Sequence, residues 1–82
     1  MSEVATGAKL ADVFRRALDI PSDVDVTTLA YGKDERWDSI GHMVLVAEIE
    51  DAYGVLLDTD DVIGLSSFQA AVELLERLGT TL

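Results

Sequence analysis

Apolar residues recur at helical spacing in three long stretches of the chain and in one short stretch, and no segment alternates with the period of a strand. The first long stretch is residues 8–18, AKLADVFRRAL. Its apolar residues lie three or four positions apart, which predicts an amphipathic helix. They are Leu10, Val13, Phe14, Ala17 and Leu18. Pro21 prevents the helix from continuing because its ring clashes with the preceding turn and it lacks an N–H.

Residues 19–37 show no helical period, and proline, glycine, aspartate and threonine are scattered along them. A connection of this length without secondary structure is unusual in a compact domain. We therefore expect it to cross the helices and to pack on them. Its candidate anchors are Val24, Val26, Leu29 and Tyr31.

Residues 39–53, SIGHMVLVAEIEDAY, form the clearest helical pattern. Asp38 or Ser39 can cap the first turn, and Gly54 supplies the left-handed residue that ends the helix. Residues 58–64, DTDDVIG, start with acids suited to capping and predict one or two further turns.

The last helix is expected over about residues 67–78, after the capping box Ser66-x-x-Gln69, and Gly79 ends it. Its inward residues are predicted to be Phe68, Ala71, Val72, Leu75 and Leu78. The chain is thus predicted to be one all-α domain over residues 1–82, a small four-helix bundle. Three helices are longer, the third is short, and a long loop joins the first two. Disorder and fraying are expected at the ends, about residues 1–6 and 79–82.

The second predicted helix has two apolar faces. The core stripe is Met43, Val46, Ile49 and Tyr53, and the outer stripe is Ile40, Val44, Ala47 and Asp51, with Ser39 at its top. Four helices in 82 residues cannot cover this helix on every side. The outer stripe, rimmed by Glu48, Glu50 and Asp51, is therefore a candidate surface for partners. The alternative is that the first helix or the long loop covers Val44 and Ala47.

Acidic residues are concentrated in the second part of the chain. Residues 1–33 carry a net charge of −1 and residues 34–82 carry −9, of a total of −10. This asymmetry disfavours nucleic acids and anionic membranes as partners and favours basic protein surfaces, although an acidic solubilising face is the alternative.

The length and composition exclude several classes of function. A chain of 82 residues buries one modest core, so an enzyme with a deep pocket is not expected. The chain has no cysteine, which excludes disulfides and thiolate metal sites. No apolar run reaches about 18 residues, and the first residues lack the pattern of a signal peptide, so we expect a cytoplasmic protein.

Ser39, within ERWDSIGHM, has three interpretations. It is a helix cap, or the first helical residue behind an Asp38 cap. It is a hydrolytic nucleophile assisted by His42, although that chemistry also needs an orienting group, an oxyanion hole and a pocket, which this small chain cannot supply. Or it is a modified serine, because a phosphodiester at an exposed helix start would meet free N–H groups and the positive end of the helix dipole.

The stretch WDSIGHMVLVAEIEDAYGVLLDTDDVIGLSSFQAAVELLERL, residues 37–78, resembles the second half of an acyl carrier protein without an evident gap. The shared features are a D-S-L-like signature at residues 38–40, an acidic second helix, a short third helix and the Gln-Ala-Ala stretch at residues 69–71. The first helix and the long loop fit the same architecture more loosely.

The resemblance implies that Ser39 receives 4′-phosphopantetheine from coenzyme A and carries an acyl or aminoacyl group as a thioester. The arm would supply the thiol that the cysteine-free chain lacks. Asp38 would present Ser39 to the phosphopantetheinyl transferase, and Ile40 would enter an apolar pocket on partner enzymes. The other partner-facing residues that it implies are Val44 and Ala47, together with the acids Glu48, Glu50, Asp51 and Asp61, which would pair with lysine and arginine.

Some positions depart from the family pattern. Ile40 stands where leucine is usual, and Gly41, His42 and Val44 replace acidic or polar residues that are common in fatty-acid carriers. These departures favour a stand-alone carrier of polyketide-type or other secondary-metabolite biosynthesis, and we expect it to be a monomer. Its partners would be an acyl-loading ligase or acyltransferase and downstream synthase or tailoring enzymes. His42 would be a surface residue near the arm, or a contact to its phosphate.

Two alternatives to an acyl carrier remain open. One is an aminoacyl or peptidyl carrier of nonribosomal peptide synthesis, which shares the fold and the modified serine. The other, from a different class, is an acidic helical interaction module in which Ser39 is only a cap.

Overall fold

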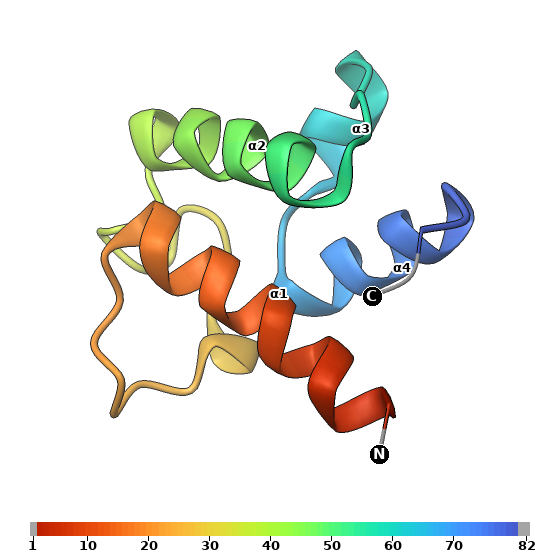
Figure 1. Ribbon diagram of the computed structural model, residues 1–82. Coiled ribbons are helices and arrows are strands. Elements are labelled where there is room, and N and C mark those ends of the chain that lie inside the picture. The colour runs from red at the N-terminus through yellow and green to blue at the C-terminus, as the bar shows by residue number, and fades with distance from the viewer. Residues whose placement is uncertain (1, 81–82) are drawn as a thin grey trace.

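A computed structural model describes residues 2–80 and the side chains of residues 8–80. The elements follow in the order α1 (Ser2–Leu18), η1 (Val26–Thr28), α2 (Ser39–Tyr53), α3 (Thr59–Gly64) and α4 (Phe68–Arg77), as Figure 1 shows. Over residues 2–80 the fold is all-helical and has no named strand, which confirms the predicted class. The ends were expected to be disordered or frayed; of these, residues 1, 81 and 82 lie outside the described residues.

The helix ends follow from local capping. α1 begins at Ser2, six residues before the expected start, and ends at Leu18, where Asp19 takes a left-handed φ of 57°. Aspartate tolerates this conformation better than most residues, so it ends the helix two positions before Pro21. α2 has the predicted bounds and ends at Gly54, which has a φ of 64°.

The predicted capping box of the last helix is wrong by one residue. Ser67, not Ser66, is the N-cap of α4, and its hydroxyl accepts a hydrogen bond from the Ala70 N–H at 3.0 Å. The cause is a short extended pairing: Ser67 forms an isolated antiparallel bridge with Ala30, and the Ser66 carbonyl accepts from the Tyr31 N–H at 3.0 Å. This pairing holds Ser67 in the extended conformation that a cap requires.

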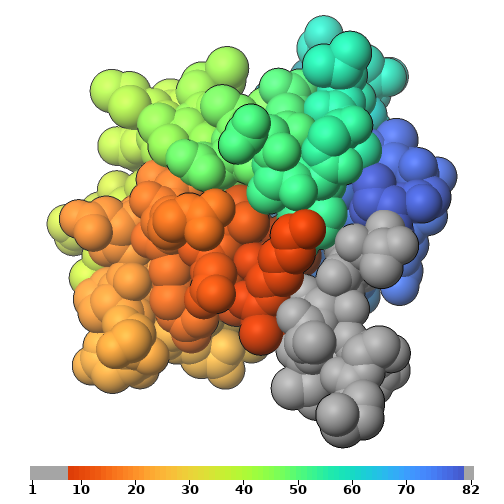
Figure 2. All heavy atoms as spheres, in the orientation of Figure 1, coloured from red at the N-terminus to blue at the C-terminus, as the bar shows by residue number. Residues whose placement is uncertain are grey.

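The core is centred on three aromatic rings from different segments. Phe14 of α1 lies edge-on to Trp37 with ring centroids 5.4 Å apart, and it lies 5.2 Å from Phe68 of α4. Trp37, the last residue before the Asp38 cap, is completely buried, although the sequence reading did not select it as an anchor. α1 also packs along α2, and Figure 2 shows their side chains in contact on the face seen there. The other buried apolar residues are Leu10, Val13, Leu18, Ile20, Val26, Leu29, Leu45, Val46, Ile49, Leu65, Ala71, Leu74 and Leu75.

Two residues predicted to face the core are exposed. Met43 is 60% exposed, whereas Val46 and Ile49 are buried as predicted, Tyr53 is half-buried, and Leu45 is buried although it was not assigned to the core. At 100° per residue, Met43 lies about 110° from the centre of the buried face of α2 and only about 70° from the centre of the outer stripe. Leu78 is also exposed, because α4 ends at Arg77 and Leu78 is its C-cap.

The connection between α1 and α2 packs on the helices as expected. Val26 and Leu29 are buried and Val24 is half-buried, but Tyr31 is exposed, which contradicts its predicted role as an apolar anchor. A main-chain bond also holds this residue in place, since its N–H donates to the Ser66 carbonyl.

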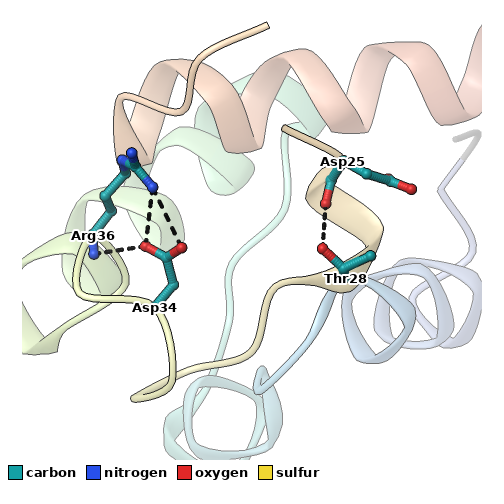
Figure 3. A network of polar contacts seen from close by, with 4 residues as sticks. All are labelled: Asp25, Thr28, Asp34 and Arg36. Atoms are coloured by element: carbon teal, nitrogen blue, oxygen red, sulfur yellow. Dashed lines mark hydrogen bonds and ion pairs between the residues drawn. The ribbon is translucent and has the colours of Figure 1, made fainter. Parts of the chain in front are cut away.

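Side chains of the connection also order its own turns. Thr27 donates to the carboxylate of Asp25, and these hydrogen bonds hold the pKa of Asp25 below its usual value. Figure 3 shows the Thr28 hydroxyl, which donates to the Asp25 carbonyl at 2.7 Å, and the ion pair of Arg36 with Asp34. The connection is therefore an ordered segment that leads into the first turn of α2.

Among residues 2–80, no helix combines the length and the apolar composition that crossing a membrane requires.

Candidate functional site

Ser39 is the first residue of α2, and its neighbour performs the capping. The Asp38 carboxylate accepts a hydrogen bond from the Gly41 N–H at 2.8 Å, and Asp38 has the extended backbone of an N-cap. The Ser39 side chain is exposed, and its Oγ lies 3.3 Å from the Tyr31 hydroxyl. Of the two capping alternatives, the structure therefore has Asp38 as the cap. The Ser39 hydroxyl is not used for capping.

Gly41 brings the preceding turn close to the helix. A Cβ at this position would lie 2.4 Å from the Arg36 carbonyl oxygen and 3.1 Å from Cδ2 of Leu18. Real Cβ atoms essentially never come that close to a backbone atom, so only glycine fits without a shift of the chain. The glycine that departs from the family pattern thus allows the turn before Ser39 to pack directly on the first turn of α2.

His42 is half-buried rather than a plain surface residue, and both of its ring nitrogens have partners; its place near an arm or its phosphate stays a prediction. Nδ1 accepts a hydrogen bond from Trp37 Nε1–H at 2.9 Å. Because indole is only a donor, Nδ1 carries no proton in this bond. Nε2 then carries the proton and donates to the Val62 carbonyl, also at 2.9 Å. His42 thus joins the α1–α2 connection, α2 and α3.

This arrangement does not provide a serine–histidine pair. The imidazole of His42 is bonded to Trp37 and Val62, so neither nitrogen is available to accept the Ser39 proton. In the part of the chain that the structure describes, no group of three or more His, Cys, Asp or Glu residues is arranged to hold a metal ion. The geometry at Ser39 therefore gives no support to nucleophilic hydrolysis.

The outer stripe of α2 lies in the open. Ile40 is 77% exposed, Val44 is 42% exposed, and Ala47 is exposed as well, so the alternative that α1 or the connection covers them is wrong. These side chains line a shallow groove of about 710 Å³ that begins at Ser39. The complete lining is Ser39, Ile40, Met43, Val44, Ala47, Glu48 and Asp51. Met43, which the sequence reading placed in the core, belongs to this surface.

The predicted partner-facing acids divide into two groups. Glu48 and Asp51 line the groove, and Glu48 also forms an ion pair of 3.5 Å with Arg16 of α1. Glu50 and Asp61 lie elsewhere. The Glu50 carboxylate accepts a hydrogen bond from the Leu57 N–H at 2.9 Å, within the α2–α3 connection.

Asp61 has structural partners at the start of α3 and on α4. It completes a capping box with Asp58 and forms an ion pair of 3.3 Å with Arg77 of α4. The structure thus brings together the attachment candidate, the apolar stripe and two acids, and it leaves Glu50 and Asp61 outside that groove.

Sequence reasoning misjudged two residues that shape this site. Met43 was assigned to the core by its spacing of three residues from Val46, whereas its angle at 100° per residue lies nearer the centre of the outer stripe. Tyr31 was counted as an anchor because it is large and partly apolar, and no local signal indicates that its hydroxyl reaches Ser39. Comparisons with protein families, with curated proteins and with solved structures found no match to the chain.

Proposed function

We propose that this protein is an acyl carrier that bears 4′-phosphopantetheine on Ser39 and presents a thioester-bound acyl group to partner enzymes. The observation that carries the proposal is the placement of Ser39. Its hydroxyl is exposed at the first turn of α2, is not used for capping, and lies at the end of an apolar groove rimmed by acids. The resemblance of residues 37–78 to carrier proteins supplies the chemistry.

In the proposed modification, Ser39 Oγ attacks the phosphorus of coenzyme A that bears the pantetheine. A bond forms between Oγ and phosphorus, and the anhydride P–O bond to the nucleotide breaks. Adenosine 3′,5′-bisphosphate leaves, and the serine proton passes to a basic group of the transferase. Because the product is a phosphodiester, the site gains one negative charge and a flexible arm that ends in a thiol.

The groove on α2 is the proposed docking surface for the transferase and for the loading and downstream enzymes. Ile40, Val44 and Ala47 offer apolar contacts, while Glu48 and Asp51 attract basic residues. The chain would work in the cytoplasm, as a monomer, in polyketide-type or other secondary-metabolite biosynthesis. Glu50 and Asp61 contribute charge to the field that steers partners rather than contacts in the groove.

The test is incubation with coenzyme A and a broad-specificity phosphopantetheinyl transferase, followed by intact-mass measurement. The wild type is expected to gain one arm, and Ser39→Ala is expected to gain none. Because Asp38 is the cap, Ser39→Ala should also keep its melting temperature within a few degrees. Ser66→Ala is the matched control, since Ser66 is an exposed serine that is not a helix cap, and it should be modified normally.

Two outcomes would contradict the proposal. An adduct on Ser39→Ala would move the attachment site. A wild type that gains no arm would leave the acidic interaction module, with Ser39 as a plain first-turn residue, as the remaining function. Loading of the modified protein with acyl rather than aminoacyl groups then separates an acyl carrier from a carrier of peptide synthesis.

A further inference from the structure

The hydroxyl of Tyr31 lies within hydrogen-bond distance of the candidate attachment serine. Tyr31 Oη lies 3.3 Å from Ser39 Oγ, and either atom can be the donor. The contact joins two segments, since Tyr31 belongs to the α1–α2 connection and Ser39 begins α2. Tyr31 is 43% exposed, so its ring is not held there by burial alone.

Several contacts fix the position of the Tyr31 ring. It lies edge-on to Trp37 with centroids 6.5 Å apart and tilted on His42 at 4.9 Å. Aromatic pairs at these separations attract each other beyond simple burial of area. The backbone is also held, because the Tyr31 N–H donates to Ser66 and the Gly32 N–H donates to Trp37.

The two supporting rings are themselves fixed. Trp37 is completely buried and donates its indole N–H to His42. The other nitrogen of His42 is bonded to the Val62 carbonyl on α3. The place of the Tyr31 hydroxyl is thus set by a chain of contacts that runs from α3 through His42 and Trp37, and not by free rotation of an exposed side chain.

We propose that Tyr31 is a positioning residue for the modification of Ser39, an inference that rests on the proposed function. Before transfer, Tyr31 donates to Ser39 Oγ, which restricts the serine rotamer and leaves the serine proton free to face the base of the transferase. After transfer, Ser39 Oγ is an ester oxygen without a proton. Tyr31 is then the only possible donor of the two, and it donates to an oxygen of the phosphodiester, a charge-assisted hydrogen bond.

The test compares Tyr31→Phe with Tyr53→Phe. Both variants lose one phenolic hydroxyl and keep the ring, and Tyr53 lies at the other end of α2. Modification rates are measured with coenzyme A and the transferase, while the carrier concentration is varied. We expect kcat for Tyr31→Phe to fall roughly 2- to 10-fold, the loss expected for one hydrogen bond, with KM and the melting temperature little changed. Tyr53→Phe should retain wild-type kinetics.

A second measurement examines the modified protein directly. The ³¹P resonance of the phosphodiester should differ between the wild type and Tyr31→Phe, and it should be the same in the wild type and Tyr53→Phe. The inference is overturned if Tyr31→Phe keeps both the wild-type kcat and the wild-type resonance. It is also overturned if kcat falls only in step with the melting temperature, because the hydroxyl would then act through the fold.

The two proposals fail in distinguishable ways. A wild type that accepts no arm removes the carrier function and, with it, any role of Tyr31 in the reaction. A wild type that accepts the arm, and that Tyr31→Phe matches in both kcat and the ³¹P resonance, leaves the carrier function standing and removes only the positioning role.

Discussion

Val44 and Val46 offer a matched test of which face of α2 is free, because the same substitution can be made two positions apart on one helix. Val44 is 42% exposed and lines the groove, whereas Val46 is 6% exposed and belongs to the core. Both are changed to aspartate. The two positions have the same residue type and a similar helical context. The difference in stability between the two variants therefore reports how deeply each position is buried.

The expected loss of stability for each variant follows from the burial of its position. Val46→Asp loses about 1.5–3 kcal/mol of apolar burial and adds a cost of several kcal/mol for an unpaired carboxylate in the core. The free energy of unfolding of an 82-residue domain is about 4–12 kcal/mol, from roughly 0.05–0.15 kcal/mol per residue, so the variant should be largely unfolded. Val44→Asp loses only part of a valine's burial and gains a like-charge neighbour in Glu48, four residues on, which costs about 0.2–0.5 kcal/mol.

Thermal unfolding followed by circular dichroism measures the difference. A cost near 1 kcal/mol shifts the melting temperature of a domain of this size by about 4–8 °C, which is the largest shift expected for Val44→Asp. Val46→Asp should show no cooperative transition, or one lowered far more. In the modification assay, Val44→Asp should be folded but slow, since the charge enters an apolar contact. Equal destabilisation by both variants, or unfolding by Val44→Asp alone, would show that the rotation of α2 described above is incorrect.

Two further predictions concern single residues. Gly41→Ala should destabilise the protein by about 1–3 kcal/mol, because the new Cβ would lie 2.4 Å from the Arg36 carbonyl oxygen and the chain must shift. Urea unfolding measures this loss, and a variant as stable as the wild type would contradict the close contact. Tyr53→Phe should be as stable as the wild type at neutral pH or slightly more stable, because the Tyr53 hydroxyl is buried and has no hydrogen-bond partner among the side chains that the structure describes, residues 8–80. Burial also raises the pKa of Tyr53. The stability linked to its proton is therefore fully present below the ordinary pKa of about 10 and is lost as pH rises toward the raised value, so the wild type should lose more stability than Tyr53→Phe above about pH 10.

The helices could be predicted from sequence because their signals are local. The bounds of α2 follow from an acid at the cap and a glycine at the end, and the inward residues of α1 follow from spacing alone. The capping of α4 could not be predicted in the same way. The local signal favours Ser66, because Gln69 follows it at the position of a capping box, but the structure uses Ser67, which forms a bridge with Ala30, 37 positions away in the sequence.

The candidate site was predictable to a similar extent. Helical phase predicted the exposed outer stripe, whereas the role of Ser39 as an attachment site is a proposal that rests on the motif. The bond from Trp37 to His42 and the contact of Tyr31 with Ser39 could not be predicted, because both depend on how the connection folds back on α2. No periodic pattern encodes that path. His42 was therefore predicted to be a surface residue and Tyr31 an anchor, although each has a specific partner.

The capping of α2 by Asp38 rather than Ser39 has a consequence for the energetics of repeated use. If the serine oxygen held the helix start, every chemical change on it would alter the stability of the fold, and by linkage the fold would resist or favour that change. With the cap on the neighbouring residue, a substituent on Ser39 would leave the bond between Asp38 and Gly41 intact, so it would change the folding equilibrium only through its own new contacts. A transferase acting on Ser39, as proposed, would then break no capping bond, and the start of α2 would be capped in the same way before and after the modification.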